Sequence, residues 1–449
     1  MENISQDTIC AIATAPGGAL GIIRISGNNT FSCLEKIFFP LGKTPLCERK
    51  NHEAVFGKII DGDNIVDEVL VTIFRNPHSF TGEDSAEISC HGSSYILNKV
   101  IQLLMLNGCR MARPGEYTQR AFMNGKMDLS QAEAVADVIA SNSAASHKIA
   151  MSQMRGGFSK ELKGLRDQLL HITSLLELEL DFGDHEELEF ADRTELNSLA
   201  NKIIQHITTL VNSYHTGNAI KNGVPVAIIG PTNAGKSTLL NALLHEERAI
   251  VSNVHGTTRD TIEDVITING IQFRFIDTAG IRETTDQIEA MGIERSFQMI
   301  DRADIVLLVT APDCSLTTEE IEKIKQRCKE KHLIHLQNKC DISHNSQFMN
   351  ISAKQGIGIQ ELENHLATLI GNKISGESQL VSNLRHYEAL KSALENMKRV
   401  KEGLEMQLSG DLVSLDLRSV LYDIGIITGQ QFSDNEVLGN IFKHFCIGK

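Results

Sequence analysis

The spacing of apolar residues divides the chain into regions of different texture. Up to about residue 118, short β-rich runs alternate with glycine turns, and "LGIIRISG" (20–27) predicts a strand that ends in a turn. The runs "HEAVFGKII" and "VDEVLVTIF" flank "DGDN", which indicates a β-hairpin. "SYILNKVIQLLML" ahead of "NG" predicts a helix. We therefore expect an α+β N-terminal domain over residues 1–118.

Two later regions have the spacing of amphipathic helices. The first covers 119–218, and "GNAIKNG" (217–223) ends its pattern. The second, 377–449, contains one helix from about Leu390 and another from Asp411 to "DIG". The apolar faces are formed by Leu162, Leu165, Leu169, Ile172, Leu176 and Leu180, by Leu196, Leu199, Ile203, Ile207 and Leu210, and by Leu390, Leu394, Met397, Leu404 and Leu408.

Between these helical regions, buried strands alternate with helices. The strands are "VPVAIIG", "IQFRFIDTAG", "ADIVLLVT", "HLIHLQNK" and "FMNIS", and this alternation is typical of a parallel sheet covered on both faces. We therefore predict an α/β domain (219–376) inserted into helical sequence. The flanking helical segments can pack together as one domain or form two small bundles. We favour one domain, because a helical pair alone buries too little surface to offset its entropy cost.

Composition narrows the classes of function. A length of 449 residues suggests about three domains. The formal net charge of -14 argues against a free-standing nucleic-acid binder, so any RNA contact needs a local basic patch or a partner's surface. Nine scattered cysteines without a C-x-x-C pair indicate neither a zinc site nor a disulfide framework. With no secretory signal and no apolar run of about 18 residues, we expect a cytoplasmic protein outside the membrane.

The stretch "GPTNAGKST" (230–238) carries the strongest chemical signal. It fits the P-loop pattern G-x-x-x-x-G-K-[ST], and it follows a predicted strand and opens a predicted helix. Gly230 and Gly235 let backbone N–H groups face phosphates, and the helix N-terminus adds partial positive charge. Lys236 can reach the β- and γ-phosphates, and the Ser237 hydroxyl can bind Mg²⁺.

Downstream motifs favour GTP over ATP. "HGTTRD" supplies Thr258 for the Mg²⁺ shell, and "DTAG" (277–280) supplies Asp277 and the Gly280 N–H for the phosphate end. In "NKCD" (338–341), Asp341 can accept two hydrogen bonds from guanine that adenine cannot offer. "SAK" (352–354) can place an N–H on the guanine carbonyl oxygen. Taken singly, "DTAG" and "SAK" are weak evidence for GTP binding. All five motifs in this order are strong evidence for it.

The water-orienting glutamine of Ras-like enzymes is missing. Its position holds Ile281, and no arginine finger is evident in the chain. Asn233 and backbone oxygens of 252–257 could instead hold a monovalent cation beside the phosphates. Glu289 could orient water, although a solvated helix carboxylate explains it equally well at this stage.

With these residues assigned, the chain resembles the MnmE (TrmE) family of tRNA-modification GTPases over nearly its full length. The resemblance rests on "IIRISG", "SFTGEDSAEISCHG", "RPGEYTQRAFMNGKMDLSQAEA", "GPTNAGKSTLLNAL", "GTTRD", "DTAGIRET", "NKCD" and "FCIGK". The segments outside the GTPase domain are the specific ones, because many GTPases share the others.

The resemblance implies a tetrahydrofolate-binding N-terminal domain that dimerises, followed by a helical domain split by a potassium-activated GTPase domain. It also implies an FAD-containing partner, MnmG (GidA), in a heterotetramer or larger complex. Together the two would add an aminomethyl or carboxymethylaminomethyl group to C5 of the wobble uridine of certain tRNAs. The one-carbon unit would come from 5-formyl- or 5,10-methylene-tetrahydrofolate.

The resemblance also assigns roles to residues. Catalytic roles fall to Lys236, Glu289 and Cys446. The folate contacts are Arg24, Glu87, Lys126 and Lys449, the Mg²⁺ ligands Ser237 and Thr258, and the K⁺ ligands Asn233, Ser252, Val254 and Thr257, with Ser252 in place of a commoner threonine. GTP would be bound by Asn233, Ala234, Gly235, Lys236, Ser237, Thr238, Ser252, Asn253, Val254, His255, Gly256, Thr257, Thr258, Asp277, Thr278, Ala279, Gly280, Asn338, Lys339, Asp341, Ser352, Ala353 and Lys354.

Two functions of different class stay open. One is the tRNA-modifying enzyme, and the other is a regulatory or ribosome-assembly GTPase that acts by partner binding. The chain's acidity favours the first, because an assembly factor should carry a basic RNA-binding domain. The terminal "CIGK" has three readings, as a prenylation box, a frayed end or part of a site. Gly448 and Lys449 fit a prenylation box poorly, so we expect an ordered tail at the folate site.

Overall fold

The computed structural model describes most of the chain. The described residues are 7–15, 17–181, 193–245, 263–276, 289–314, 316–376, 380–430 and Gly448. They belong to two compact units, one formed by 1–139, 153–167 and 421–449, and the other by 140–152 and 168–420. The helices α5 (Ala144–Met154), α6 (Gly157–Asp181) and α14 (Gly410–Thr428) contribute residues to both.

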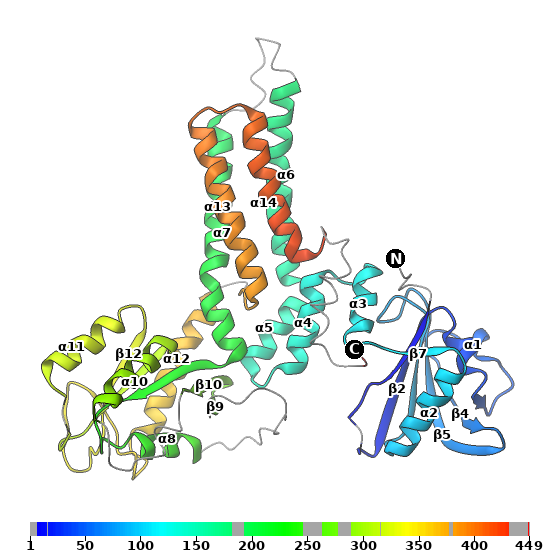
Figure 1. Ribbon diagram of the computed structural model, residues 1–449, viewed down its shortest axis with the longest axis horizontal. Coiled ribbons are helices and arrows are strands. Elements are labelled where there is room, and N and C mark those ends of the chain that lie inside the picture. Colours follow the sequence, from blue (N-terminus) through cyan, green and yellow to red (C-terminus); the bar gives the residue numbers. More distant parts are fainter. Residues whose placement is uncertain are drawn as a thin grey trace. The chain divides into compact units, whose positions relative to one another are not determined.

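A seven-stranded sheet forms the centre of the first unit (Figure 1). Its strand order is β3-β4-β5-β6-β2-β1-β7, and all neighbours are antiparallel except β1 and β7. The predicted hairpin is confirmed, because β4 and β5 pair up to Asp61 and Asn64. The strands are β1 (Thr8–Ile12), β2 (Leu20–Ser26), β3 (Phe38–Pro40), β4 (Ala54–Asp61), β5 (Asn64–Phe74), β6 (Ser85–His91) and β7 (Cys109–Met111).

The helix α2 (Ser94–Leu106) covers one face of this sheet and confirms the helix predicted there. Its Leu97, Val100 and Leu104 are buried together with alternate residues of the strands, such as Ile23 and Ile88. Because side chains alternate along a strand, the residues between them point to the opposite face. The other helices of this part are α1 (Thr30–Leu34), η1 (Leu46–Glu48, a 3₁₀ turn), α3 (Glu116–Met123) and α4 (Leu129–Ala140).

The second unit contains a six-stranded sheet in the order β13-β12-β11-β8-β10-β9. Every residue of β8 and β11 is buried, as expected for central strands covered on both faces. The strands are β8 (Val224–Ile229), β9 (Asp264–Ile268), β10 (Ile271–Phe275), β11 (Ile305–Thr310), β12 (His332–Gln337) and β13 (Met349–Asn350). The helices are α7 (Arg193–Asn222), α8 (Lys236–His245), α10 (Glu289–Arg302), α11 (Thr318–Arg327), α12 (Ile359–Gly376) and α13 (Leu384–Glu405).

The five strands predicted for this sheet are parallel, as expected, but the sheet has a sixth strand at one edge that the sequence analysis did not predict. The strand β9 runs antiparallel to β10, and the other neighbours are parallel. Asn269 and Gly270 join the two strands, and both have positive φ (49° and 77°). An Asn-Gly pair is the usual signal for such a tight hairpin turn, so "TINGIQ" did carry this information. The strand predicted at "FMNIS" is also shorter than expected, with only Met349–Asn350 paired.

The helix α7 does not stop at "GNAIKNG" as predicted, but continues to Asn222. Gly217 allows the backbone at Val381 to pack closely against α7, because a Cβ at this position would lie 2.2 Å from the Val381 carbonyl oxygen. The last turn stays helical because Ala219 and Ile220 are buried in the core of the second sheet. The helix α14 likewise extends past "DIG" to Thr428, and its Ile424 and Ile427 are buried.

The long helices α7 and α13 lie side by side, which confirms that the two helical segments pack on each other (Figure 1). Tyr214 and Tyr387 stack with ring centroids 4.3 Å apart, and the Val381 N–H donates to the Ser213 Oγ at 3.0 Å. The predicted boundaries at 118 and 218 fall inside α3 and α7, and the division into four domains stays a prediction. Among the described helices, none is long and apolar enough to cross a bilayer.

Candidate functional site

The loop between β8 and α8 approaches other backbone so closely that two of its positions require glycine. Gly230 has φ of +145°, and a Cβ there would lie 2.1 Å from the Val309 carbonyl oxygen. Gly235 has φ of +94°, and a Cβ there would lie 2.1 Å from the Asn338 Nδ2. Only glycine combines these φ values with so little space. The loop therefore has the tight curl that a phosphate-binding loop needs, with glycine at its two closest approaches.

Lys236 begins α8 and folds back over this loop. Its Nζ donates to the carbonyl oxygens of Gly230 at 2.8 Å and Pro231 at 2.7 Å. Burial lowers the pKa of the lysine, and nearby Cys314 opposes the shift only partly. Ser237 follows in the same first turn of the helix. The ammonium group, the helix N-terminus and the serine hydroxyl thus gather where phosphates and Mg²⁺ would bind.

Asn338 connects three of the predicted motifs. Its Nδ2 donates to the Ala234 carbonyl oxygen of the P-loop at 2.8 Å. Its Oδ1 accepts from the Ala353 N–H of "SAK" at 3.0 Å. Asn338 is buried, so both bonds are shielded from water. The P-loop, "NKCD" and "SAK" therefore meet at one place, as the nucleotide-site prediction requires.

Asp341 and Lys339 extend from this junction toward solvent. The Asp341 Oδ1 accepts from the buried Ser352 Oγ at 2.7 Å, and the aspartate itself is exposed. Lys339 has φ of +60°, and its Nζ binds both carboxylate oxygens of Asp313 at 2.9 and 2.8 Å. The sequence analysis missed Asp313, which has no motif of its own and is identified only by this contact.

Several predicted site residues cannot be compared with this geometry. Those outside the described residues are Ser252, Asn253, Val254, His255, Gly256, Thr257, Thr258, Asp277, Thr278, Ala279, Gly280, Cys446 and Lys449. Glu289 begins α10, but its side chain is also outside the described part. Asn233 lies in the P-loop with φ of +63° and is exposed, as are Thr238 and Lys354. The roles of all these residues stay predictions.

A second polar site lies on the sheet of the first unit. Arg24 on β2 is directly opposite Glu87 on β6 in the strand register. The Arg24 Nη2 is 2.7 Å from the Glu87 Oε1, and its Nη1 donates to the Gly448 carbonyl oxygen at 2.9 Å. Gly448 is buried, and a Cβ there would lie 2.7 Å from the Ile12 carbonyl oxygen. The structure therefore brings two predicted folate contacts together with one residue of "CIGK".

Lys126, the third predicted folate contact in the described region, lies on the segment after α3. Its Nζ donates to the Pro77 carbonyl oxygen at 2.8 Å, in the loop that joins β5 to β6. Phe80 belongs to the same loop, and its ring centroid is 5.9 Å from the Arg24 guanidinium carbon. Lys126 therefore contacts the same loop whose Phe80 lies beside Arg24.

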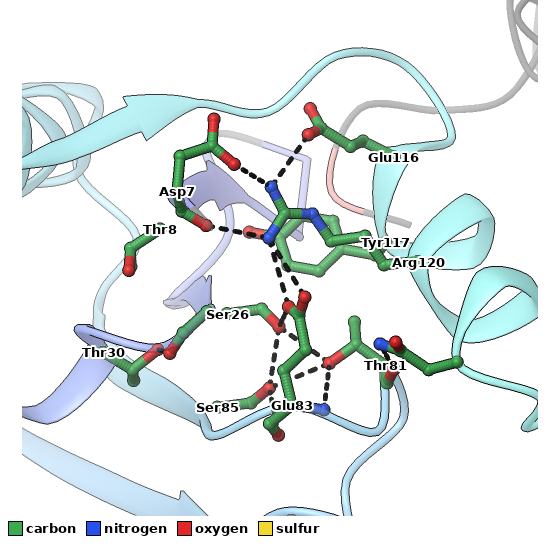
Figure 2. A network of polar contacts seen from close by, with 12 residues as sticks. Asp7, Thr8, Ser26, Thr30, Thr81, Glu83, Ser85, Glu116, Tyr117 and Arg120 are labelled. Atoms are coloured by element: carbon green, nitrogen blue, oxygen red, sulfur yellow. Dashed lines mark hydrogen bonds and ion pairs between the residues drawn. The ribbon is translucent and has the colours of Figure 1, made fainter. Parts of the chain in front are cut away.

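A partly buried network of charges lies beside this site (Figure 2), with Glu83, Glu116 and Arg120 buried. Arg120 on α3 binds Glu83 at 3.2 Å, Asp7 at 2.5 Å and Glu116 at 3.1 Å. Arg110 binds Glu116 and Asp7 at 2.6 and 2.7 Å. Buried charges are costly unless paired in this way. Sequence analysis did not single out Arg120, because nothing in "EYTQR" shows that the chain start and a distant loop meet there.

Two carboxylates of this network, Asp7 and Glu116, have pKa values below their ordinary ones. Burial by itself would raise the pKa of Asp7 and of Glu116. Hydrogen bonds from the arginines, with the Arg113 N–H at Glu116, outweigh burial and lower both pKa values from the ordinary 3.8 and 4.5. Both groups therefore favour the charged form in the folded protein.

These shifts predict acid destabilisation of the first unit. A carboxylate with a lowered folded pKa stabilises the fold above its unfolded pKa, and this stabilisation is lost as the pH falls through the folded value. The free energy of unfolding should therefore decrease below about pH 4.5, as measured by urea unfolding between pH 6 and 3. Glu116→Gln should flatten this dependence, whereas Asp63→Asn in the hairpin turn should not. A free energy that is constant down to pH 3 would contradict the prediction.

Two family models match the chain. One, described as the N-terminus of the GTP-binding protein TrmE, matches residues 8–126, and the other, described as the MnmE helical domain, matches residues 129–446. The tRNA modification GTPase MnmE of Bacteroides thetaiotaomicron is 57% identical over 473 residues, which cover 99% of this chain and 100% of that protein. The protein of the same name from Phocaeicola vulgatus is 53% identical over 500 residues, which cover 100% of both.

Solved structures align with about a third of the chain. The G domain of FeoB from Methanococcus jannaschii aligns with 33% of this chain and 98% of that chain, at 21% identity and a TM-score of 0.23.

Proposed function

The chain belongs to the MnmE family of tRNA modification GTPases, and from this premise we propose the reaction that its GTP hydrolysis serves. With an FAD-containing partner of the MnmG (GidA) kind, the protein adds an aminomethyl or carboxymethylaminomethyl group to C5 of the wobble uridine of certain tRNAs. A folate supplies the one-carbon unit. The protein acts as a homodimer in a larger assembly with the partner, in the cytoplasm where its tRNA substrates are.

One contact carries the folate part of this proposal. Arg24 binds Glu87 and the carbonyl oxygen of Gly448 at the same time. Folate has carboxylates that suit arginine and lysine, and a pterin edge of N–H donors that suits a carboxylate. Arg24, Glu87, Lys126 and Lys449 are therefore proposed as its contacts, with Cys446 close to the one-carbon unit or the target base.

The nucleotide site fits GTP and Mg²⁺. The curl at Gly230 and Gly235 leaves backbone room for phosphates, and Asp341 keeps a carboxylate oxygen without a partner among the described residues for the guanine edge. We propose that Ser237 and Thr258 hold Mg²⁺, which neutralises phosphate charge when it is bound. Glu289 would orient the attacking water.

Potassium provides a test of the P-loop assignment. Asn233, with backbone oxygens at Ser252, Val254 and Thr257, is proposed to hold K⁺ in place of an arginine finger. GTP turnover should be at least about tenfold faster in K⁺ than in Na⁺, because a cation beside the transferred phosphoryl group stabilises its developing charge. Asn233→Ala should remove this difference in steady-state phosphate release, while Thr232→Ala at the neighbouring exposed position should keep it. Equal wild-type turnover in both salts would rule out the site.

The proposed reaction itself is tested by mass spectrometry of wobble-uridine nucleosides. Cells that lack this protein should lose the modified nucleoside, and the full chain supplied on a plasmid should restore it. Normal modification in the deletion strain would instead support the second reading, a regulatory GTPase that acts by partner binding alone.

A further inference from the structure

Phe80 is exposed in the middle of a loop whose neighbouring residues are buried. Ser79, Thr81, Gly82 and Glu83 are all buried, whereas Phe80 is 40% exposed. The loop is held internally, because the Ser79 Oγ donates to the Glu83 carbonyl oxygen at 2.5 Å and the Glu83 N–H donates to the Thr81 Oγ1 at 3.2 Å. The loop therefore holds a large apolar ring at the surface, where a bound aromatic ring could cover it.

Side chains of α3 and of the residues after it form hydrogen bonds along the loop from Pro77 to Glu83. Arg120 binds the Glu83 carboxylate, the Asn124 Nδ2 donates to the Thr81 carbonyl oxygen at 2.8 Å, and the Lys126 Nζ donates to that of Pro77 at 2.8 Å. Figure 2 shows Arg120 between Glu83 and Asp7, with Ser26 and Thr81 on the other side of Glu83. The loop is therefore held by side chains from two elements, the α3 region on one side and Ser26 of β2 on the other.

The same fastening places two rings around Arg24. The Arg24 guanidinium carbon is 5.9 Å from the Phe80 ring centroid and 5.7 Å from that of Tyr117. Tyr117 is fully buried, and its hydroxyl donates to the Arg24 carbonyl oxygen at 2.8 Å. Tyr117 is therefore part of the interior, and Phe80 is the ring on the solvent side.

We propose that Phe80 is a ring-stacking wall of the folate site, and that Arg120 is the residue that positions it through Glu83. This rests on the proposed folate function. Because Arg24 and Glu87 are in contact, both lie at one end of a bound folate, and the N–H edge of the pterin suits the Glu87 carboxylate. A pterin bound there is a flat ring that needs an apolar surface beside it. An exposed aromatic ring next to Arg24 supplies it.

The wall is tested by the binding of 5-formyltetrahydrofolate to the full chain, measured by isothermal titration calorimetry. Phe80→Ala should weaken binding about tenfold, the scale of losing one stacked ring. Phe80→Tyr should bind like the wild type, whereas Phe80→Leu should lose most of the affinity. The matched control is Tyr95→Ala, which removes a ring of 73% exposure elsewhere on the same unit and should change nothing. Unchanged affinity in Phe80→Ala would overturn the proposal, as would full affinity in Phe80→Leu.

The positioning role is tested by a double-mutant cycle with Glu83→Gln, which keeps the shape of the side chain and endangers folding less than a change at buried Arg120. If Glu83 acts by placing Phe80, then Glu83→Gln weakens folate binding severalfold in the wild type and has no further effect in Phe80→Ala. If Glu83→Gln weakened folate binding by the same factor in the wild type and in Phe80→Ala, the positioning role would be overturned. Such additivity would mean that the substitution destabilises the unit generally and does not act through Phe80.

Failure of this inference can be told from failure of the folate site itself. Arg24→Ala should abolish binding if the site is correct. If Arg24→Ala loses folate binding while Phe80→Ala keeps it, only the stacking role of Phe80 is refuted. Absence of binding in the wild type refutes the proposed site and the wall with it.

Discussion

Asp341→Asn should change the ratio of the affinities for GTP and xanthosine triphosphate by about a thousandfold in favour of the latter. Guanine presents two donors to the carboxylate, and an amide in its place offers one donor and one acceptor. The change in the ratio contains two mismatches, GTP against the amide of the variant and xanthosine triphosphate against the carboxylate of the wild type. Hydrogen bonds to a charged group contribute about 1.5–3 kcal/mol each, so the ratio should change by roughly two to four orders of magnitude. Xanthine has a carbonyl where guanine has its amine, and it restores the match.

The measurement is competition between the two nucleotides for a fluorescent GDP analogue. Ser352 should keep the asparagine in place, because its hydroxyl can still donate to the amide oxygen as it does to Asp341. The control is Asp313→Asn, a nearby exposed carboxylate that binds Lys339 and should leave base preference unchanged. If Asp341→Asn retained the GTP preference, Asp341 would not be the base-reading residue.

Cys446→Ser should reduce the wobble-uridine modification to the level of the deletion strain. A serine hydroxyl is almost fully protonated at neutral pH, whereas a cysteine forms a thiolate readily, so a reaction that needs the sulfur should stop. GTP hydrolysis and folate binding should persist, because the nucleotide site and Arg24 are unchanged. The readout is nucleoside mass spectrometry of tRNA from complemented deletion cells.

The matched control for that experiment is Cys47→Ser, an exposed free cysteine of the first unit. It should restore modification fully. Removing the last four residues should also weaken folate binding, because the Gly448 carbonyl oxygen no longer accepts from Arg24. A Cys446→Ser protein that supports normal modification would show that the cysteine has no chemical part in the reaction.

The sequence predicted the fold class, which is confirmed: an α+β N-terminal domain, and a P-loop GTPase domain inserted into helical sequence. It also predicted that the P-loop, "NKCD" and "SAK" cooperate, and Asn338 does join them. These were accessible because each motif follows a strand of one sheet, and parallel strands end at a common edge. The chemistry is local to each motif, so short patterns suffice to identify it.

The parts that sequence reasoning missed depend on contacts between distant segments. The segment "GNAIKNG" was predicted to end the helical pattern, because glycine usually weakens a helix. Gly217 instead lies inside α7, where a Cβ would clash with the Val381 carbonyl oxygen. Arg120 was missed because its partners Asp7 and Glu83 lie 113 and 37 residues away in the chain. Such residues have no pattern of their own, and only the packed structure distinguishes them from surface charges.

The unbroken helix α7 connects the nucleotide site to residues far from it. Its 30 residues run from Arg193 to Asn222 and continue through Gly223 into β8, whose far end is the P-loop. A helix of that length is about 45 Å long, and side-by-side packing with α13 stiffens it. A tilt of about 5° at the β8 end would therefore move the opposite end by about 4 Å. A small rotation at the nucleotide site would therefore reach the far end of this helix as a shift of several ångströms.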